Sequence, residues 1–99
     1  MSLRHVVLFR FAPKTTPDQV AALSEGLSGL PLKIAEIRAY RHGPDAGISA
    51  TSWDYALIAD FDSAEKFQAY RDHPDHVRVI REIIDPMAAE RVSVQLTID

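Results

Sequence analysis

The run from Leu3 to Phe11 constrains the fold of this chain more than any other segment. It is rich in β-branched and aromatic residues, which is typical of a β-strand. One side of the strand carries Leu3, Val7, Phe9 and Phe11 together with His5, and the other side carries Val6 and Leu8 between Arg4 and Arg10. A strand that is covered on a single face alternates more cleanly between apolar and polar residues. We therefore expect this strand to be covered on both faces.

The first helix is predicted from a cap and a stop signal. Thr16 and Gln19 have the spacing of a capping box. Apolar residues follow at helical spacing, and Gly29 and Pro31 are expected to end the element. The pattern predicts a helix over residues 17–29.

The remaining elements follow from the same signals. We expect strands at 34–41, 53–61 and 91–98, a helix from Asp62 or Ser63 to Asp72 or His73, and a helix from Pro74 to about Ile84. The pair Asp85-Pro86 is expected to end the last helix, because a proline disfavours the helical conformation at the residue before it. The order β-α-β-β-α-α-β is the ferredoxin-like plan of one α+β domain over residues 1–99, with a four-stranded antiparallel sheet and helices on one face.

Such a sheet leaves its second face without helices. The apolar residues expected on that bare face are Val6, Leu8, Ile37, Ala56 and Ile58. An exposed apolar patch of this kind usually marks an interface, and two copies packed sheet to sheet would bury it. A homodimer is therefore expected, since self-association also adds buried area to a domain of only 99 residues.

The composition argues against several classes of protein. The net charge is −3 and the 11 lysines and arginines are scattered, so we expect no nucleic-acid partner. No apolar run approaches the roughly 20 residues that span a bilayer, and the first residues lead directly into a strand without a secretory signal. We expect no membrane partner, no cofactor and a cytoplasmic location. With no cysteine, disulfides are absent and a metal site is not expected.

Residues 67–77 contain the side chains best suited to chemistry. Pro74 disfavours helix at His73 and begins the next helix, so Tyr70 closes one helix and His76 lies in the first turn of the next. The helix dipole and partial burial both disfavour the charged form of His76, and a neutral imidazole can act as a general base. The alternative is structural: both side chains hold the junction together, and the Tyr70 hydroxyl bonds to a neighbouring group.

Two further histidines are interpreted as structural. His73 is expected to cap the helix that begins at Pro74. A metal pair of His73 and His76 would lack the third ligand that a zinc site needs. His42, beside Gly43 and a proline, is expected to be solvated in a loop.

The chain resembles the stress-responsive dimeric α/β-barrel family, known as Dabb, in three segments that match in order. These are His5-Val-Val-Leu-Phe-Arg-Phe11, Asp54-Tyr-Ala-Leu-Ile-Ala-Asp-Phe-Asp62 and Tyr70-x-x-His-Pro-x-His76. The resemblance covers essentially the whole chain, and its most specific element is the tyrosine followed by His-Pro-x-His. It implies a ferredoxin-like protomer, a homodimer whose sheets close into a dimeric α/β barrel, and a pocket between the sheet and the helices.

The family includes a plant polyketide cyclase that is similar to this chain. The resemblance implies Tyr70 and His76 as the catalytic pair and His5 in the same pocket, while Tyr55 stands where the cyclase has a further histidine. The residues that we expect to bind a ligand are His5, Tyr55, Val7, Phe9 and Leu57.

Three functions stay open at this point. The first is a cofactor-free cyclase or lyase that acts on an apolar carbonyl compound, with His76 as base and Tyr70 as hydrogen-bond donor. The second is a non-catalytic, stress-related dimer that binds a ligand or has a structural role. A monooxygenase of the related antibiotic-biosynthesis type is the third, because it shares the fold but not the motifs.

Overall fold

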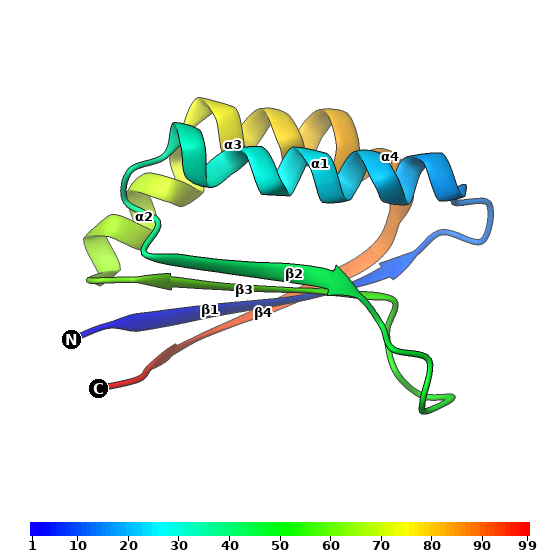
Figure 1. Ribbon diagram of the computed structural model, residues 1–99, viewed down its shortest axis with the longest axis horizontal. Coiled ribbons are helices and arrows are strands. Elements are labelled where there is room, and N and C mark those ends of the chain that lie inside the picture. Colours follow the sequence, from blue (N-terminus) through cyan, green and yellow to red (C-terminus); the bar gives the residue numbers. More distant parts are fainter.

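A computed structural model describes all 99 residues as one four-stranded sheet with the helices gathered on one of its faces (Figure 1). The elements in chain order are β1 (Leu3–Phe11), α1 (Pro17–Lys33), β2 (Ala39–Pro44), β3 (Tyr55–Phe61), α2 (Ala64–Asp72), α3 (Pro74–Val79), the π-helix η1 (Ile80–Ile84), α4 (Asp85–Met87) and β4 (Ala88–Thr97). The strand order is β2-β3-β1-β4 and all three pairings are antiparallel. The ferredoxin-like α+β fold predicted from the sequence is confirmed.

The central strand β1 sets the register of the sheet. Val7 lies opposite Leu57 of β3 on one side and opposite Ser93 of β4 on the other. Because side chains alternate along a strand, these three residues share the face that the helices cover. That inner face is apolar over β1 and β3, and it packs on α1 to form the core. The core is completed by large buried side chains: Phe9, Leu23, Leu27, Leu30, Tyr55, Phe61 and Tyr70.

The outer face of the sheet is apolar and exposed, as the sequence predicted. Its exposed large apolar residues are Leu8, Ile58, Val92, Val94 and Leu96. The last three come from β4 and were not among the residues expected there. The placement of Ile37 on this face was wrong, because it precedes β2 and packs against the core.

The prediction that Gly29 and Pro31 end the first helix was also wrong. Helix α1 runs on to Lys33 and contains Pro31 in its last turn. The proline removes one hydrogen bond there. The longer helix places Leu30 and Ile34 in the core, and Ile34 closes it by donating its N–H to the Leu30 carbonyl, 2.9 Å away. The expected capping box of Thr16 and Gln19 is present.

The strands that border the long loop begin later than predicted. β2 starts at Ala39 rather than at residue 34, because Ile34 is already buried as the cap of α1. β3 starts at Tyr55, two residues after the expected start at Trp53. Trp53 lies just before β3, and the Arg10 guanidinium stacks 4.3 Å from its ring centroid.

The last helical segment passes through Asp85-Pro86 instead of ending there. It switches from α to π geometry at Ile80 and continues to Met87, which is buried in the core. Gly26 of α1 packs closely against this segment, since a Cβ there would lie 2.8 Å from Cδ1 of Ile83. None of the helices combines the length and the apolar character that a membrane crossing requires.

Candidate functional site

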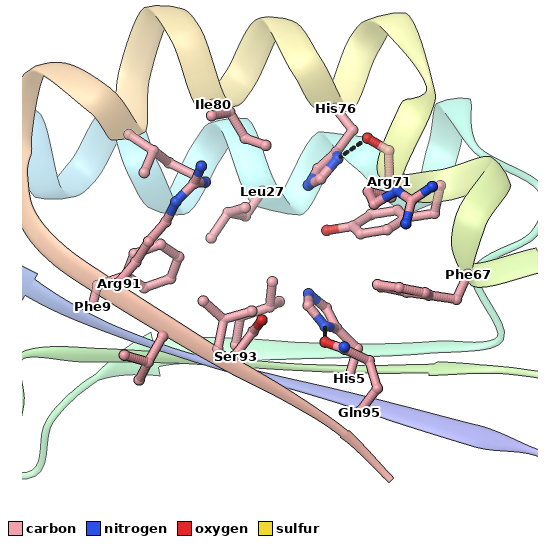
Figure 2. Close-up of a pocket in the computed structure, with 15 residues that line it drawn as sticks. His5, Phe9, Leu27, Phe67, Arg71, His76, Ile80, Arg91, Ser93 and Gln95 are labelled. Carbon is pink, nitrogen blue, oxygen red and sulfur yellow. Dashed lines mark hydrogen bonds between the residues drawn. The ribbon is translucent and has the colours of Figure 1, made fainter. Parts of the chain in front are cut away.

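A cavity of about 340 Å³ lies between the sheet and the helices (Figure 2). Its apolar lining is Val7, Phe9, Leu27, Leu57, Phe67, Ile80 and Ile84. Val92 borders it at the edge of the sheet, although its register position opposite Leu8 lies on the outer face. Its polar lining is His5, Tyr70, Arg71, His76, Arg91, Ser93 and Gln95. One side of the cavity is bordered by the edge strand β4, which is exposed along almost its whole length. An apolar space with a few converging polar groups is typical of a small-molecule site.

The helix break places Tyr70 and His76 on the same wall of this cavity. Helix α2 ends at Asp72, and His73 caps both this helix and the next one. The His73 Nδ1 atom accepts a hydrogen bond from the Asp75 backbone N–H at 3.1 Å. Pro74 begins α3, as predicted, and His76 follows in its first turn. The rings of Tyr70 and His76 lie against each other with centroids 4.1 Å apart.

His76 is held in one tautomer. Its Nδ1 lies 3.0 Å from the carbonyl oxygen of Arg71. A carbonyl can only accept a hydrogen bond, so Nδ1 carries the hydrogen and Nε2 of the neutral ring has a free lone pair. Figure 2 shows this second nitrogen directed into the cavity. Burial lowers the pKa of His76, although the bond to the Arg71 carbonyl opposes that shift, so the ring is neutral near pH 7.

His5 faces His76 from the opposite wall (Figure 2). Its Nδ1 donates to the side-chain oxygen of Gln95 over 2.7 Å, which again leaves Nε2 as the acceptor on the cavity side. Burial lowers the pKa of His5 too, while the bond to Gln95 acts in the other direction. The ring also packs against Phe67, with centroids 4.9 Å apart.

The Tyr70 hydroxyl belongs to a pair of phenols. It lies 2.8 Å from the hydroxyl of Tyr40 on β2, and either oxygen can donate. Burial raises the pKa of Tyr70 to about 12, and burial likewise raises the pKa of Tyr40. Both rings are therefore neutral at pH 7. When Tyr40 donates to Tyr70, the hydrogen of Tyr70 is free to bond to a ligand.

Six of the seven site residues expected from the sequence line this cavity, and Tyr55 does not. Tyr55 is buried near Phe9, with ring centroids 6.1 Å apart, and its hydroxyl bonds to Nδ1 of His42 at 2.7 Å. The expectation that His42 is solvated in a loop was wrong. It lies in β2, and its other ring nitrogen is 3.0 Å from the Ser28 hydroxyl.

Four polar residues of the cavity were not anticipated: Arg71, Arg91, Ser93 and Gln95. Three of them alternate along β4, and this alternation is visible in the sequence. The sequence does not reveal which side of the strand faces the helices. No group of three or more histidine, aspartate or glutamate side chains is arranged to hold a metal ion.

Fold and cavity together define a ferredoxin-like domain with a cavity between its sheet and its helices. The chain belongs to the stress responsive A/B barrel domain family, whose match covers residues 3–98. It is 26% identical over 98 residues to a stress-response A/B barrel domain-containing protein of Arabidopsis thaliana. That alignment covers 98% of this chain and 37% of the plant protein, so the chain spans little more than a third of that relative.

Two solved structures illustrate the likeness. A dimeric ferredoxin-like protein of unknown function from Thermobifida fusca is 45% identical, with a TM-score of 0.92 over 99% of this chain and 92% of the other. The hydroxynitrile lyase of Passiflora edulis is 20% identical, with a TM-score of 0.86 over 99% and 94% of the two chains. At the lower identity the likeness establishes the fold alone.

Proposed function

We propose that this chain is a cofactor-free cyclase or lyase that acts on an apolar carbonyl compound and works as a homodimer. The observation that carries the proposal is the Nε2 lone pair of His76, which the bond between Nδ1 and the Arg71 carbonyl directs into a largely apolar cavity. A buried imidazole with a lowered pKa is a suitable general base near neutral pH.

In the proposed reaction, His76 takes a proton from the carbon next to the substrate carbonyl. The electron pair of the broken C–H bond moves into the carbonyl, and the oxygen gains negative charge. Tyr70 donates a hydrogen bond to that oxygen, supported by its bond from Tyr40. The enolate then attacks a second carbonyl or expels a leaving group. The protonated His76 returns its proton to the product, so no net proton is consumed.

The fold is compatible with such chemistry, because the hydroxynitrile lyase of Passiflora edulis shares it. Fold likeness alone does not assign a reaction. The proposal therefore rests on the arrangement of His76 and Tyr70, and the lyase shows only that a scaffold of this shape can host an enzyme.

The proposed dimer joins the outer faces of two sheets. This face presents five exposed apolar residues from three adjacent strands, more than scattered exposure would place side by side. The Thermobifida fusca protein is described as dimeric, which supports a homodimer here. Packed face to face, the two sheets form a dimeric α/β barrel with the helices outside.

A non-catalytic ligand-binding dimer is the second candidate. It is favoured by the internal bonds of the site, since His76 is bonded to the backbone at Arg71 and Tyr70 is bonded to Tyr40. These contacts also stabilise the helix junction. A protein of this kind would bind the same apolar ligands without moving a proton.

Proton abstraction can be measured before the complete reaction is known. We expect the protein in heavy water to exchange α-protons of a panel of aryl ketones and β-diketones for deuterium, followed by NMR. His76→Ala should slow the exchange by about 10²–10⁴-fold, and Tyr70→Phe should slow it less. His73→Asn is the control, because His73 caps the same helix but does not line the cavity.

Exchange that is unaffected by His76→Ala would contradict the proposed role of the imidazole. If ketones bind to the cavity but exchange is no faster than in buffer, the non-catalytic candidate is correct. Binding is read in the same samples from the NMR signals of cavity residues.

A further inference from the structure

The polar lining of the cavity has an uneven charge. Two arginines, Arg71 and Arg91, line it, and no aspartate or glutamate does. The two histidines of the lining are neutral near pH 7, because burial lowers the pKa of both. The cavity is therefore positive although the whole chain has a net charge of −3. Charge of one sign in a partly closed site attracts ligands of the opposite sign.

The two arginines differ in what they are bonded to. Arg71 is paired with Asp72 through two hydrogen bonds of 2.9 and 3.1 Å. Arg91 makes no ion pair and no side-chain hydrogen bond, whereas Arg4, Arg10, Arg38 and Arg78 all pair with carboxylates. Arg41 and Arg81 are also unpaired, but neither lines the cavity. Arg91 is thus the one unpaired cation at the site.

Arg91 lies at one end of the row of cavity residues on β4, where it can contact the end of an elongated ligand. It extends from β4 toward Ile80 on the helical side (Figure 2), and Phe9 lies opposite it in the sheet register. Ser93 follows on the same face, and then Gln95, which holds His5. Gln95 lies four residue steps along the strand from Arg91, or about 13 Å at 3.3 Å per residue. Apolar side chains line the space between the two ends.

We propose that the ligand of this cavity is a monocarboxylate with an apolar body, and that Arg91 binds its carboxylate. The inference rests on the proposed function, since it describes the substrate of the same site: the carboxylate lies at Arg91, the carbonyl oxygen accepts from Tyr70, and the α-carbon lies at His76. The guanidinium matches a carboxylate in a two-bond geometry, and the hydroxyl of Ser93 is a neighbouring donor. One unpaired cation balances a singly charged group better than a doubly charged phosphate.

Matched pairs of small molecules test this assignment. The probes are phenylacetate, hexanoate and benzoylpropionate, each compared with its primary amide, which has nearly the same shape without the charge. We expect each acid to bind about three- to tenfold more tightly than its amide, since the site is partly open to solvent. NMR shifts of cavity residues locate the binding, and calorimetry gives the affinities.

Substitutions distinguish a specific contact with Arg91 from the effect of the overall charge of the protein. Arg91→Gln should bring each acid to the affinity of its amide, and Arg91→Lys should keep part of the preference. Arg81→Gln is the matched control, because it removes the same charge from an exposed and unpaired arginine outside the cavity, and it should leave the preference unchanged. Circular dichroism confirms the fold of each variant.

Three results would overturn the assignment: amides that bind as well as acids, a preference that survives Arg91→Gln, or no acid that binds in the cavity. The same titrations on His76→Gln keep this inference distinct from the proposed chemistry. If the acids bind selectively but the protein exchanges no α-protons, the carboxylate site stands and the catalytic role of His76 fails.

Discussion

β3 and β4 flank the same central strand, and they expose opposite patterns to the helices. On β3 the inner positions are Tyr55, Leu57, Ala59 and Phe61, all buried. On β4 the inner positions are Arg91, Ser93 and Gln95, all exposed, while the valines and the leucine of this strand point outward. Hydrophobic alternation is present in both strands. In β3 it is directed toward the core, and in β4 it is directed away from it.

The two strands have different roles within one small domain. The β3 side provides the core, where large side chains are packed without exposure to water. The β4 side provides polar residues of the cavity wall, and its apolar residues enlarge the outer face that we propose as the dimer interface. If β4 had the pattern of β3, apolar side chains would replace the polar residues of this wall of the cavity.

We expect the largest effect on stability from substitutions in β3, which contributes to the core. Phe61→Ala should lower the free energy of unfolding by about 3–5 kcal/mol, because it leaves a cavity among rings that are fully buried. Ser93→Ala, on the inner face of β4, should change it by no more than about 0.5 kcal/mol. Urea unfolding of both variants gives the comparison, and similar losses in the two would show that β4 belongs to the core.

An intermediate effect is expected on the outer face. Leu8→Lys should weaken dimer formation by at least about 100-fold, because the charge would be buried without a partner between two sheets. Leu32→Lys is the control, since Leu32 is 91% exposed near the end of α1 in the helical layer. Analytical ultracentrifugation distinguishes the two. A wild-type protein that is monomeric and fully folded at micromolar concentration would contradict the proposed interface.

The sequence was sufficient for the order of elements and for the helix break at Pro74, because caps, proline and periodicity act locally. It failed where tertiary packing outweighs local preference. Pro31 lies inside α1, since burial of Leu30 and Ile34 compensates for the lost hydrogen bond. His42 pairs with Tyr55 although it stands beside a glycine and a proline, because strand pairing with β3 depends on residues far along the chain.

The candidate site was anticipated only in part, for a related reason. Tyr70, His76 and His5 belong to segments that match a motif or the family resemblance, and they line one cavity. Arg91 and Gln95 lie outside those segments. Their alternation along β4 is clear, but the direction of that alternation depends on the helices not covering this edge of the sheet. Alternation with a period of two shows which residues share a face of the strand. It does not show which of the two faces points toward the helices.

The smallest effect we expect is a dependence of stability on pH. Burial lowers the pKa of His76, of His5 and of His42 below the value of about 6.5 found in unfolded chains. Between the lowered pKa values and pH 6.5, the unfolded chain binds more protons than the folded one, so stability rises with pH in this range. The stability that the three neutral histidines contribute is fully present above about pH 7.5. It is lost as the pH falls from about 6.5 through the lowered pKa values.

Substitution assigns this pH dependence to the two walls of the cavity. His76→Gln and His5→Gln should each reduce the fall in unfolding free energy between about pH 7.5 and pH 5.5, and the double variant should reduce it further. Gln95→Ala should lower the pKa of His5 further, because the bond to Gln95 raises it, and NMR titration measures that change directly. The effect of Gln95→Ala should be largest at His5, whose hydrogen-bond partner lies on β4. His76, which is bonded to the helical backbone at Arg71, feels His5 only through its charge and should therefore change less, and a change at His76 of the same size would show that the two walls do not act separately.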